Sequence, residues 1–259
     1  MANTQHTTQV RIEQITDTED FTRCFSIAAS AFGTQTADGI WTAFYPNWNT
    51  PEGAISGAQR MLERWEHRTF DAAGNPNVVY LKATIPDPSS SESGDGKEVI
   101  AGMAIWVQAS MDKAYGDAPD TDFAKDLQVE EIYPGDEPGQ RFLCQVFGSL
   151  TKQRFKAIKE AATRNPPAIL GLDLCAVDPT FQRRGVAAEL VKWGLEEARR
   201  RGGLEAVLEA SKKGRGVYAK LGFKQEGEEI KYVIDDEFKD RVLPSNIFMR
   251  TGVLSRSAT

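Results

Sequence analysis

The amino-acid sequence predicts a mixed α/β fold built as a single domain. Segments with the two-residue periodicity of strands, or with continuous apolar runs, alternate with segments that carry apolar residues at helical spacing. The chain has 259 residues, 41% of them hydrophobic, which is enough to bury a large core without disulfides or metal ions. Because neither an internal repeat nor a linker divides it, we expect one domain over residues 10–252, preceded by a disordered N-terminus at residues 1–9.

The N-terminal half is predicted to contain a strand, two helices and a β-hairpin. The expected elements are a strand over residues 10–15, a helix from Asp17 or Thr18 to about Phe32, a helix over residues 52–70, and strands over residues 78–85 and 99–108. An aromatic-rich stretch interrupted by Pro46 and Pro51 separates the two helices, and we expect it to be a connection. The segment at residues 86–96 is rich in Ser, Pro and Gly, which predicts a mobile hairpin loop.

The C-terminal half begins irregularly and becomes sharply patterned after residue 165. Residues 109–140 are rich in Asp, Glu, Gly and Pro and predict irregular structure, and residues 142–164 predict a helix. The later elements are expected to be a strand over 168–177, a basic loop over 182–185, a helix over 187–201, a strand over 205–210, a helix over 214–221 and further strand from residue 223.

Charge and composition exclude several classes of protein. The chain has 31 Lys and Arg against 37 Asp and Glu, a net charge of −6, which argues against a nucleic-acid partner. Its two histidines, His6 and His67, are too few for a histidine-rich metal site, so we expect no metal. Cys24, Cys144 and Cys175 lie far apart without CxxC spacing, and no apolar run is long enough to span a membrane. We therefore expect a cytoplasmic protein without a membrane partner, either a monomer or a homodimer.

The loop after the strand at 168–177 has the features of a phosphate site. It opens a helix, and the first turn of a helix presents backbone N–H groups at the positive end of the helix dipole. Gly185 allows close approach of a ligand to the backbone, and Ala187 and Ala188 are small enough not to block it. Arg183 and Arg184 add positive charge. A strand, a proline turn and a helix also occur without any ligand in many α/β folds, so this pattern leaves anion binding and a plain structural role open.

The same residues resemble the signature of the GNAT acetyltransferase superfamily, Q/R-x-x-G-x-G/A between a strand and a helix. Residues Gln182 to Ala187 read Q-R-R-G-V-A, with Ala in the last place. Downstream, Tyr218 to Phe223 resembles the family's Tyr-x-x-x-Gly-Phe helix. The resemblance is strong over residues 168–224, weaker over 10–108 and absent over 109–165, which we interpret as an insertion with an extra helix. Rossmann, Walker A and α/β-hydrolase motifs are missing from the sequence.

The resemblance implies a GNAT-like fold, with a mostly antiparallel twisted sheet that splays apart at the cofactor site. It implies acetyl-CoA as cofactor, with transfer of the acetyl group to the primary amine of a small molecule, directly within a ternary complex. The cofactor residues that it implies are Ala176, Val177, Gln182, Arg183, Arg184, Gly185, Val186, Ala187, Ala188 and Ser211. Two alternatives stay open, namely an acyl-CoA-binding sensor or scaffold with little catalysis, and an O-acyltransferase.

Two residues are candidates for proton transfer. Tyr218 matches the family position that donates a proton to the leaving sulfur, and its alternative role is packing on the sheet. Asp173 interrupts an apolar strand, where a carboxylate is costly unless it is paired or faces a cleft, so it is either the general base or half of a salt bridge. Other carboxylates, such as Glu209, or a water could replace it.

The acceptor pocket is the least determined part of the prediction. In the family it is built by the first two helices, their connection and the C-terminal strands. Trp41 and Tyr45 lie in that connection and are our candidate substrate-binding residues, with burial in the core as the alternative.

Overall fold

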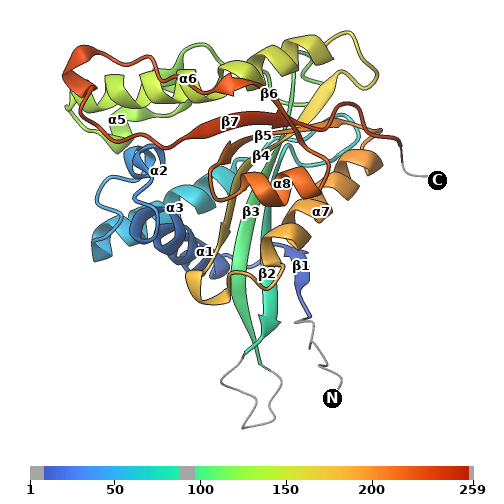
Figure 1. Cartoon of the computed structure of the whole chain (residues 1–259), viewed down its shortest axis with the longest axis horizontal. Helices are drawn as coiled ribbons and strands as arrows, with labels where there is room; N and C mark the ends of the chain where they lie inside the picture. Colours follow the sequence, from blue (N-terminus) through green and yellow to red (C-terminus); the bar gives the residue numbers. More distant parts are fainter. Residues whose placement is uncertain (1–8, 88–96, 257–259) are drawn as a thin grey trace.

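A computed structural model gives the fold of residues 9–87 and 97–256, and Figure 1 shows its arrangement. Most of the expected disordered N-terminus and of the expected mobile loop at 86–96 lies outside these residues. The strands are β1 (Arg11–Gln14), β2 (Val78–Pro86), β3 (Glu98–Ser110), β4 (Ala168–Val177), β5 (Glu205–Ser211), β6 (Lys224–Glu229) and β7 (Asn246–Arg250). They form one sheet in the order β1-β2-β3-β4-β5-β7-β6, in which only the β4–β5 pair is parallel.

Helices cover both faces of the sheet. They are α1 (Asp20–Ala28), the π-helical turn η1 (Ala29–Thr34), α2 (Gly39–Phe44), α3 (Pro51–Glu66), α4 (Phe123–Asp126), α5 (Val129–Ile132), α6 (Glu137–Ala161), α7 (Val186–Arg200) and α8 (Arg215–Lys220), with short 3₁₀ turns η3 (Pro179–Phe181) and η4 (Asp236–Phe238). A mostly antiparallel sheet flanked by helices confirms the predicted mixed α/β class.

The two faces of the sheet have separate cores because side chains alternate along each strand. On β3, Ala104 and Trp106 pack against α7, whereas Met103 and Ile105 pack against α1 and α3. The insertion helix α6 packs on the other half of the sheet, where Ile158 meets buried side chains of β4, β5 and β7. Helices α2, α5 and α6 join in a further cluster with η4. These helices surround the carboxyl ends of β4 and β5.

The structure corrects three predictions for the N-terminal half. The aromatic connection contains the short helix α2, because Asp38 caps it and Pro46 follows its end. The first helix begins at Asp20, so neither Asp17 nor Thr18 caps it. Helix α3 ends at Glu66, earlier than predicted.

The insertion is more helical than the sequence predicts. Helix α6 begins at Glu137, where Asp136 caps it and Pro138 occupies its first turn. The stretch before it, predicted to be irregular, contains the short helices α4 and α5. Within residues 9–87 and 97–256, no helix combines the length and the apolar character needed to cross a membrane.

Candidate active site

Strands β4 and β5 pair along half their length and then separate. Their parallel pairing joins Ile169–Leu172 to Glu205–Leu208 and stops there. Beyond it, β4 continues to Val177 on β3 alone, and β5 continues to Ser211 on β7 alone. The facing edges of the two strands therefore have no partner strand past Leu172 and Leu208 within the described chain. We call this point of separation the fork.

A β-bulge sits at the fork. In the β3–β4 pairing, Trp106 lies opposite Leu172 and Ile105 lies opposite Leu174, so Asp173 is an extra residue without a partner. Such bulges change which way the following side chains point. Here Leu172 packs on the α7 side, while Leu174 packs on the α1 and α3 side. The bulge thus lets a strand that is otherwise apolar carry a carboxylate beside a cavity.

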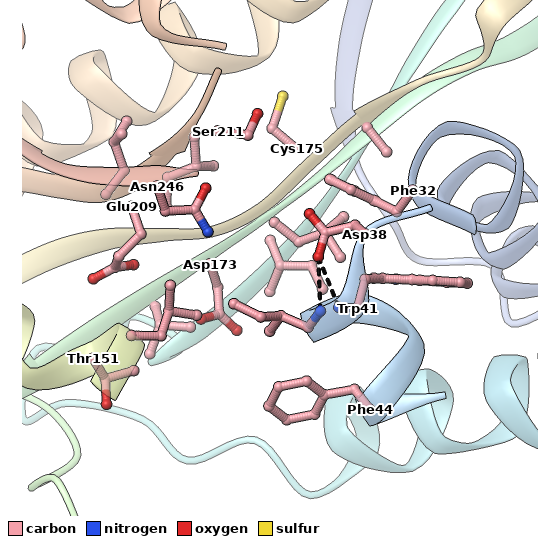
Figure 2. Close-up of a pocket in the computed structure, with 18 of the residues that line it drawn as sticks. Phe32, Asp38, Trp41, Phe44, Thr151, Asp173, Cys175, Glu209, Ser211 and Asn246 are labelled. Carbon is pink, nitrogen blue, oxygen red and sulfur yellow. Dashed lines mark hydrogen bonds between the residues drawn. The ribbon is translucent and has the colours of Figure 1, made fainter. Parts of the chain in front are cut away.

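The fork opens into a cavity of about 1420 Å³. Its walls come from the α1–α2 connection, α3, the insertion, the ends of β4 and β5, the first turn of α7, and α8 (Figures 1 and 2). The predicted site residues that line it are Trp41, Tyr45, Asp173, Ala176, Val177, Gln182, Arg183, Gly185, Val186, Ala187, Ala188, Ser211 and Tyr218. Arg184 is outside this set, because its guanidinium carbon lies over the Phe181 ring, 5.6 Å from the centroid. The structure therefore brings the other predicted residues together around one space.

The loop before α7 presents its backbone to this cavity. Gly185 precedes the helix with φ of 87°, a left-handed conformation that favours glycine. A Cβ at this position would meet no protein atom within 4 Å, so the space in front of the backbone is open. Arg183 also has a positive φ, 67°, which is uncommon for a residue with a side chain. This conformation aims the N–H groups of a 15-residue helix at open space.

Gln182 ties this loop to its surroundings. Its side-chain amide donates to the Val177 carbonyl at 3.1 Å and to Gln35 Oε1 at 2.9 Å. Gln35 Nε2 donates back to Gln182 Oε1 at 3.1 Å. The segment that leads to α2 is thus held against the loop that opens α7.

Two arginines neutralise the carboxylates at the fork. Arg64 of α3 and Arg154 of α6 each donate to Asp173 at 2.8 Å. Arg154 also donates to both carboxylate oxygens of Glu209 on β5, its Nε at 3.1 Å, and to the Leu172 carbonyl at 3.3 Å. Figure 2 shows Asp173 and Glu209 at the same end of the cavity. The sequence analysis considered both acids but missed both arginines.

These ion pairs separate the acid–base properties of the two carboxylates. Burial alone would raise the pKa of Asp173, but the charges and hydrogen bonds of Arg64 and Arg154 hold it well below its usual range. Burial raises the pKa of Glu209, although Arg154 opposes the shift. A carboxylate with a strongly lowered pKa is a weak proton acceptor. This arrangement favours the salt-bridge role of Asp173 that the sequence left open.

Tyr218 lies on the α8 side of the cavity. Its ring packs edge-on against Phe223, with centroids 6.1 Å apart. Burial, with a smaller effect of Cys175, holds the pKa of its hydroxyl well above the ordinary value, so the hydroxyl stays protonated at neutral pH. Its hydroxyl has no hydrogen-bond partner among residues 9–87 and 97–256. Burial also raises the pKa of the Cys175 thiol to about 12, which makes this cysteine a poor nucleophile.

The candidate substrate residues are part of an aromatic cluster. Trp41 is 6% exposed and lies within 6.2 Å, between ring centroids, of Phe25, Phe32, Tyr45 and Trp48. Arg60 stacks over Tyr45 at 5.1 Å and donates to the Phe44 carbonyl at 2.6 Å. Both predicted residues therefore support the core as well as line the cavity.

The described part of the chain contains no group of three or more His, Cys, Asp or Glu residues that could hold a metal ion.

Comparison with known proteins finds a family model that matches part of this chain. Residues 155–232 match the family model described as acetyltransferase (GNAT) domain, a region that runs from α6 past the fork, α7 and α8. The comparison with curated proteins gave no match.

Solved structures share the fold over nearly the whole chain. Arylalkylamine N-acetyltransferase 2 from Aedes aegypti is 19% identical with a TM-score of 0.59, covering 95% of this chain and 99% of that one. A mosquito arylalkylamine N-acetyltransferase like 5b is 13% identical with a TM-score of 0.58, covering 95% and 100%. Drosophila melanogaster polyamine N-acetyltransferase, described as forming N-acetylagmatine, is 11% identical with a TM-score of 0.52, covering 95% and 100%. At these identities the likeness establishes the fold. Together with the family match over residues 155–232, it confirms the resemblance to the GNAT acetyltransferases.

Proposed function

We propose that the protein is an acetyl-CoA-dependent N-acetyltransferase that acylates a small primary amine directly, within a ternary complex. The observation that carries this proposal is the fork, which opens into one cavity that is also lined by the first turn of α7 and by Tyr218. A cofactor channel and an acceptor pocket that share one space suit direct transfer without a covalent enzyme intermediate.

The residues present fit acetyl-CoA. The open space in front of Gly185 suits a pyrophosphate on the amides of residues 183–188, with Arg183 adding charge. The free edge of β4 past Leu172 suits an extended pantetheine arm beside Ala176 and Val177, with Ser211 across the gap. Bound there, acetyl-CoA supplies an activated acetyl group as a thioester.

Tyr218 has the properties of the acid in this reaction. Its hydroxyl keeps its proton at neutral pH, and it faces the cavity without a hydrogen-bond partner in the described chain. A hydroxyl of this kind donates a proton to a departing thiolate and recovers one afterwards.

The shape of the acceptor side favours a small amine. Aromatic side chains and residues of the insertion line the acceptor side of the cavity, and such a lining suits a compact amine with an apolar part. The proteins of similar fold are described as acting on arylalkylamines and agmatine, which supports the same substrate class here. The free thiols of Cys24, Cys144 and Cys175 support the reducing cytoplasm as its compartment.

Two measurements test this function. Isothermal titration with acetyl-CoA is expected to show saturable binding to the purified chain. A thiol-release screen over arylalkylamines, diamines, agmatine, amino acids and alcohols is then expected to show turnover with a primary amine. Absence of acetyl-CoA binding contradicts the proposal. Binding without thiol release from any acceptor favours a sensor or scaffold, and release with alcohols alone favours an O-acyltransferase.

A further inference from the structure

The proposed reaction needs a proton acceptor, and the carboxylates at the fork are poorly suited to that role. An alkyl ammonium has a pKa of about 10.4 and must lose a proton before it can attack a thioester. Asp173 is held by two arginines, and Glu209 by one. Any proton that Asp173 accepts would break two charge-assisted hydrogen bonds.

The other carboxylates that line the cavity divide into bonded, exposed and half-buried groups. Asp117 accepts hydrogen bonds from Thr69 and Asn77, and Glu63 accepts one from Gln59. Two more, Asp126 and Glu131, are solvent-exposed on the insertion. Asp120 and Asp38 are half-buried and outside these ion pairs, but Asp120 lies on the insertion, whereas Asp38 lies at the start of α2 beside the aromatic cluster.

The two carboxylate oxygens of Asp38 have different surroundings. Oδ1 caps α2 and accepts from the backbone N–H groups of Ile40 and Trp41, both at 3.0 Å. Oδ2 has no hydrogen-bond partner within residues 9–87 and 97–256. Figure 2 shows Asp38 beside Phe32 and Trp41 on one wall of the cavity, with Asp173 and Glu209 on the strands opposite. The capping bonds therefore fix a carboxylate whose second oxygen is available to a ligand.

The position of Asp38 is coupled to the cofactor loop. It follows Gln35 by three residues, and Gln35 is bonded to Gln182 at the start of that loop. An acceptor ammonium at Asp38 would have the aromatic faces of Phe32 and Trp41 beside it, which favour a cation. Burial raises the pKa of Asp38 against the effect of the two capping amides, which makes it a better proton acceptor than an exposed aspartate.

We propose that Asp38 is the catalytic residue that binds the acceptor's ammonium group and takes its proton; this assignment rests on the proposed acetyltransferase function. R–NH₃⁺ gives one proton to the Asp38 carboxylate and becomes R–NH₂. The nitrogen lone pair then attacks the thioester carbon, so that a C–N bond forms and the C–S bond breaks. Tyr218 protonates the leaving sulfur and recovers a proton from the nitrogen. Asp38 finally returns its proton to water, and the products are the N-acetyl amine, the free thiol and one proton.

The variant Asp38→Asn removes the proposed proton acceptor while keeping the cap of α2. Asparagine is also a good N-cap, so α2 keeps its first turn while the proton acceptor is lost. We expect kcat/KM at pH 7 to fall about 100-fold or more, with the Kd for acetyl-CoA within twofold of the wild type. The difference in kcat/KM between the variant and the wild type should become smaller as the pH approaches the pKa of the free amine, about 10. At that pH the acceptor amine loses its proton to solvent and does not need Asp38. Tyr232 interacts electrostatically with Asp38, and Asp173 and Glu209 lie on the strands opposite with Arg64 and Arg154 bonded to them. None of these groups changes in this variant.

Asp136→Asn is the matched control. Asp136 caps α6 through the Gly139 amide at 3.1 Å and is not part of the cavity, so its variant should keep wild-type turnover. Asp38→Ser, another capping residue, should lose turnover as Asp38→Asn does.

Each outcome decides the assignment. Turnover within threefold of the wild type in either Asp38 variant, or a deficit that stays constant with pH, overturns the role of Asp38 and leaves the proposed function intact. Loss of acetyl-CoA binding in both variants also overturns it, because Asp38 would then support the structure of the cofactor site. A wild-type protein that neither binds acetyl-CoA nor acetylates an amine contradicts the proposed function itself, and the assignment with it.

Discussion

Asp173 and Glu209 are the first residues beyond the paired stretch of β4 and β5, and the guanidinium of Arg154 binds both. The Arg154 side chain is 11% exposed and also donates a hydrogen bond to the carbonyl of Leu172, the last paired residue of β4. A planar group with several fixed donors can bridge two diverging strands in this way, and a lysine cannot. The insertion helix α6 therefore supplies the residue that occupies the fork.

The first prediction concerns Arg154. Arg154→Met leaves Asp173 and Glu209 short of a cation, and we expect a loss of about 3–5 kcal/mol in the free energy of unfolding. We also expect at least a tenfold rise in the Kd for acetyl-CoA, measured by calorimetry, because the two strands are no longer held at their separation. Arg154→Lys should restore part of the stability and little of the affinity.

Two variants separate these effects. Arg164→Met removes a comparable ion pair to β5, at Glu205, away from the cavity, and should leave acetyl-CoA binding unchanged. The double variant Arg154→Met/Glu209→Gln should recover stability because it removes a buried charge. If the double variant also recovers its affinity for acetyl-CoA, the guanidinium of Arg154 does not set the separation of β4 and β5.

The second prediction concerns Tyr218. Tyr218→Phe removes only the hydroxyl, so acetyl-CoA should bind as before while kcat falls about 10²–10⁴-fold. Steady-state kinetics with the best amine acceptor measures this. Turnover that stays within threefold of the wild type would show that Tyr218 only packs against Phe223.

The third prediction concerns Asp173. If it forms ion pairs rather than acting as the base, Asp173→Asn should leave the pKa values of the kcat/KM profile in place and cost roughly 1.5–3 kcal/mol of stability. Its pKa is lower in the folded than in the unfolded protein, so its ion pairs stabilise the fold above the unfolded value of about 3.9. That contribution should be lost only as the pH falls below this value. A shifted acid limb in the activity profile would restore Asp173 as the base.

The fourth prediction compares the two arginines of the cofactor loop. Arg183 lines the cavity, whereas Arg184 lies over Phe181. Arg183→Gln should therefore weaken acetyl-CoA binding several-fold and reduce its salt dependence, and Arg184→Gln should change both less. Titrations at two ionic strengths measure the difference, and equal effects of the two variants would contradict this division of roles.

The loop at residues 182–187 and its place between a strand and a helix could be predicted from the sequence because the signals are local. Gln182 to Ala187 lie in one stretch, and both the strand before them and the helix after them form at the expected places. Tyr218 likewise follows from a short motif. Each of these depends on neighbouring residues, which sequence patterns record well.

The rest of the site depends on contacts across long stretches of chain. Arg154 and Asp173 are 19 residues apart, and Arg64 and Asp173 are 109 apart. In the sequence, Arg64 and Arg154 fall within predicted helices and resemble ordinary solvent-exposed charges. Asp38 carried one usable signal, an aspartate directly before a short apolar segment, which is typical of a helix N-cap. The aromatic residues after it predict a connection instead, so neither α2 nor its capping carboxylate is expected from the sequence.

Calorimetric titration of the purified wild-type chain with acetyl-CoA tests the central claim most directly. We expect saturable binding of one acetyl-CoA per chain, weakened by Arg183→Gln and by Arg154→Met and unchanged in Arg164→Met. Absence of binding by the wild type, or binding that neither cavity variant weakens, would contradict the claim that the fork between β4 and β5 is a cofactor site.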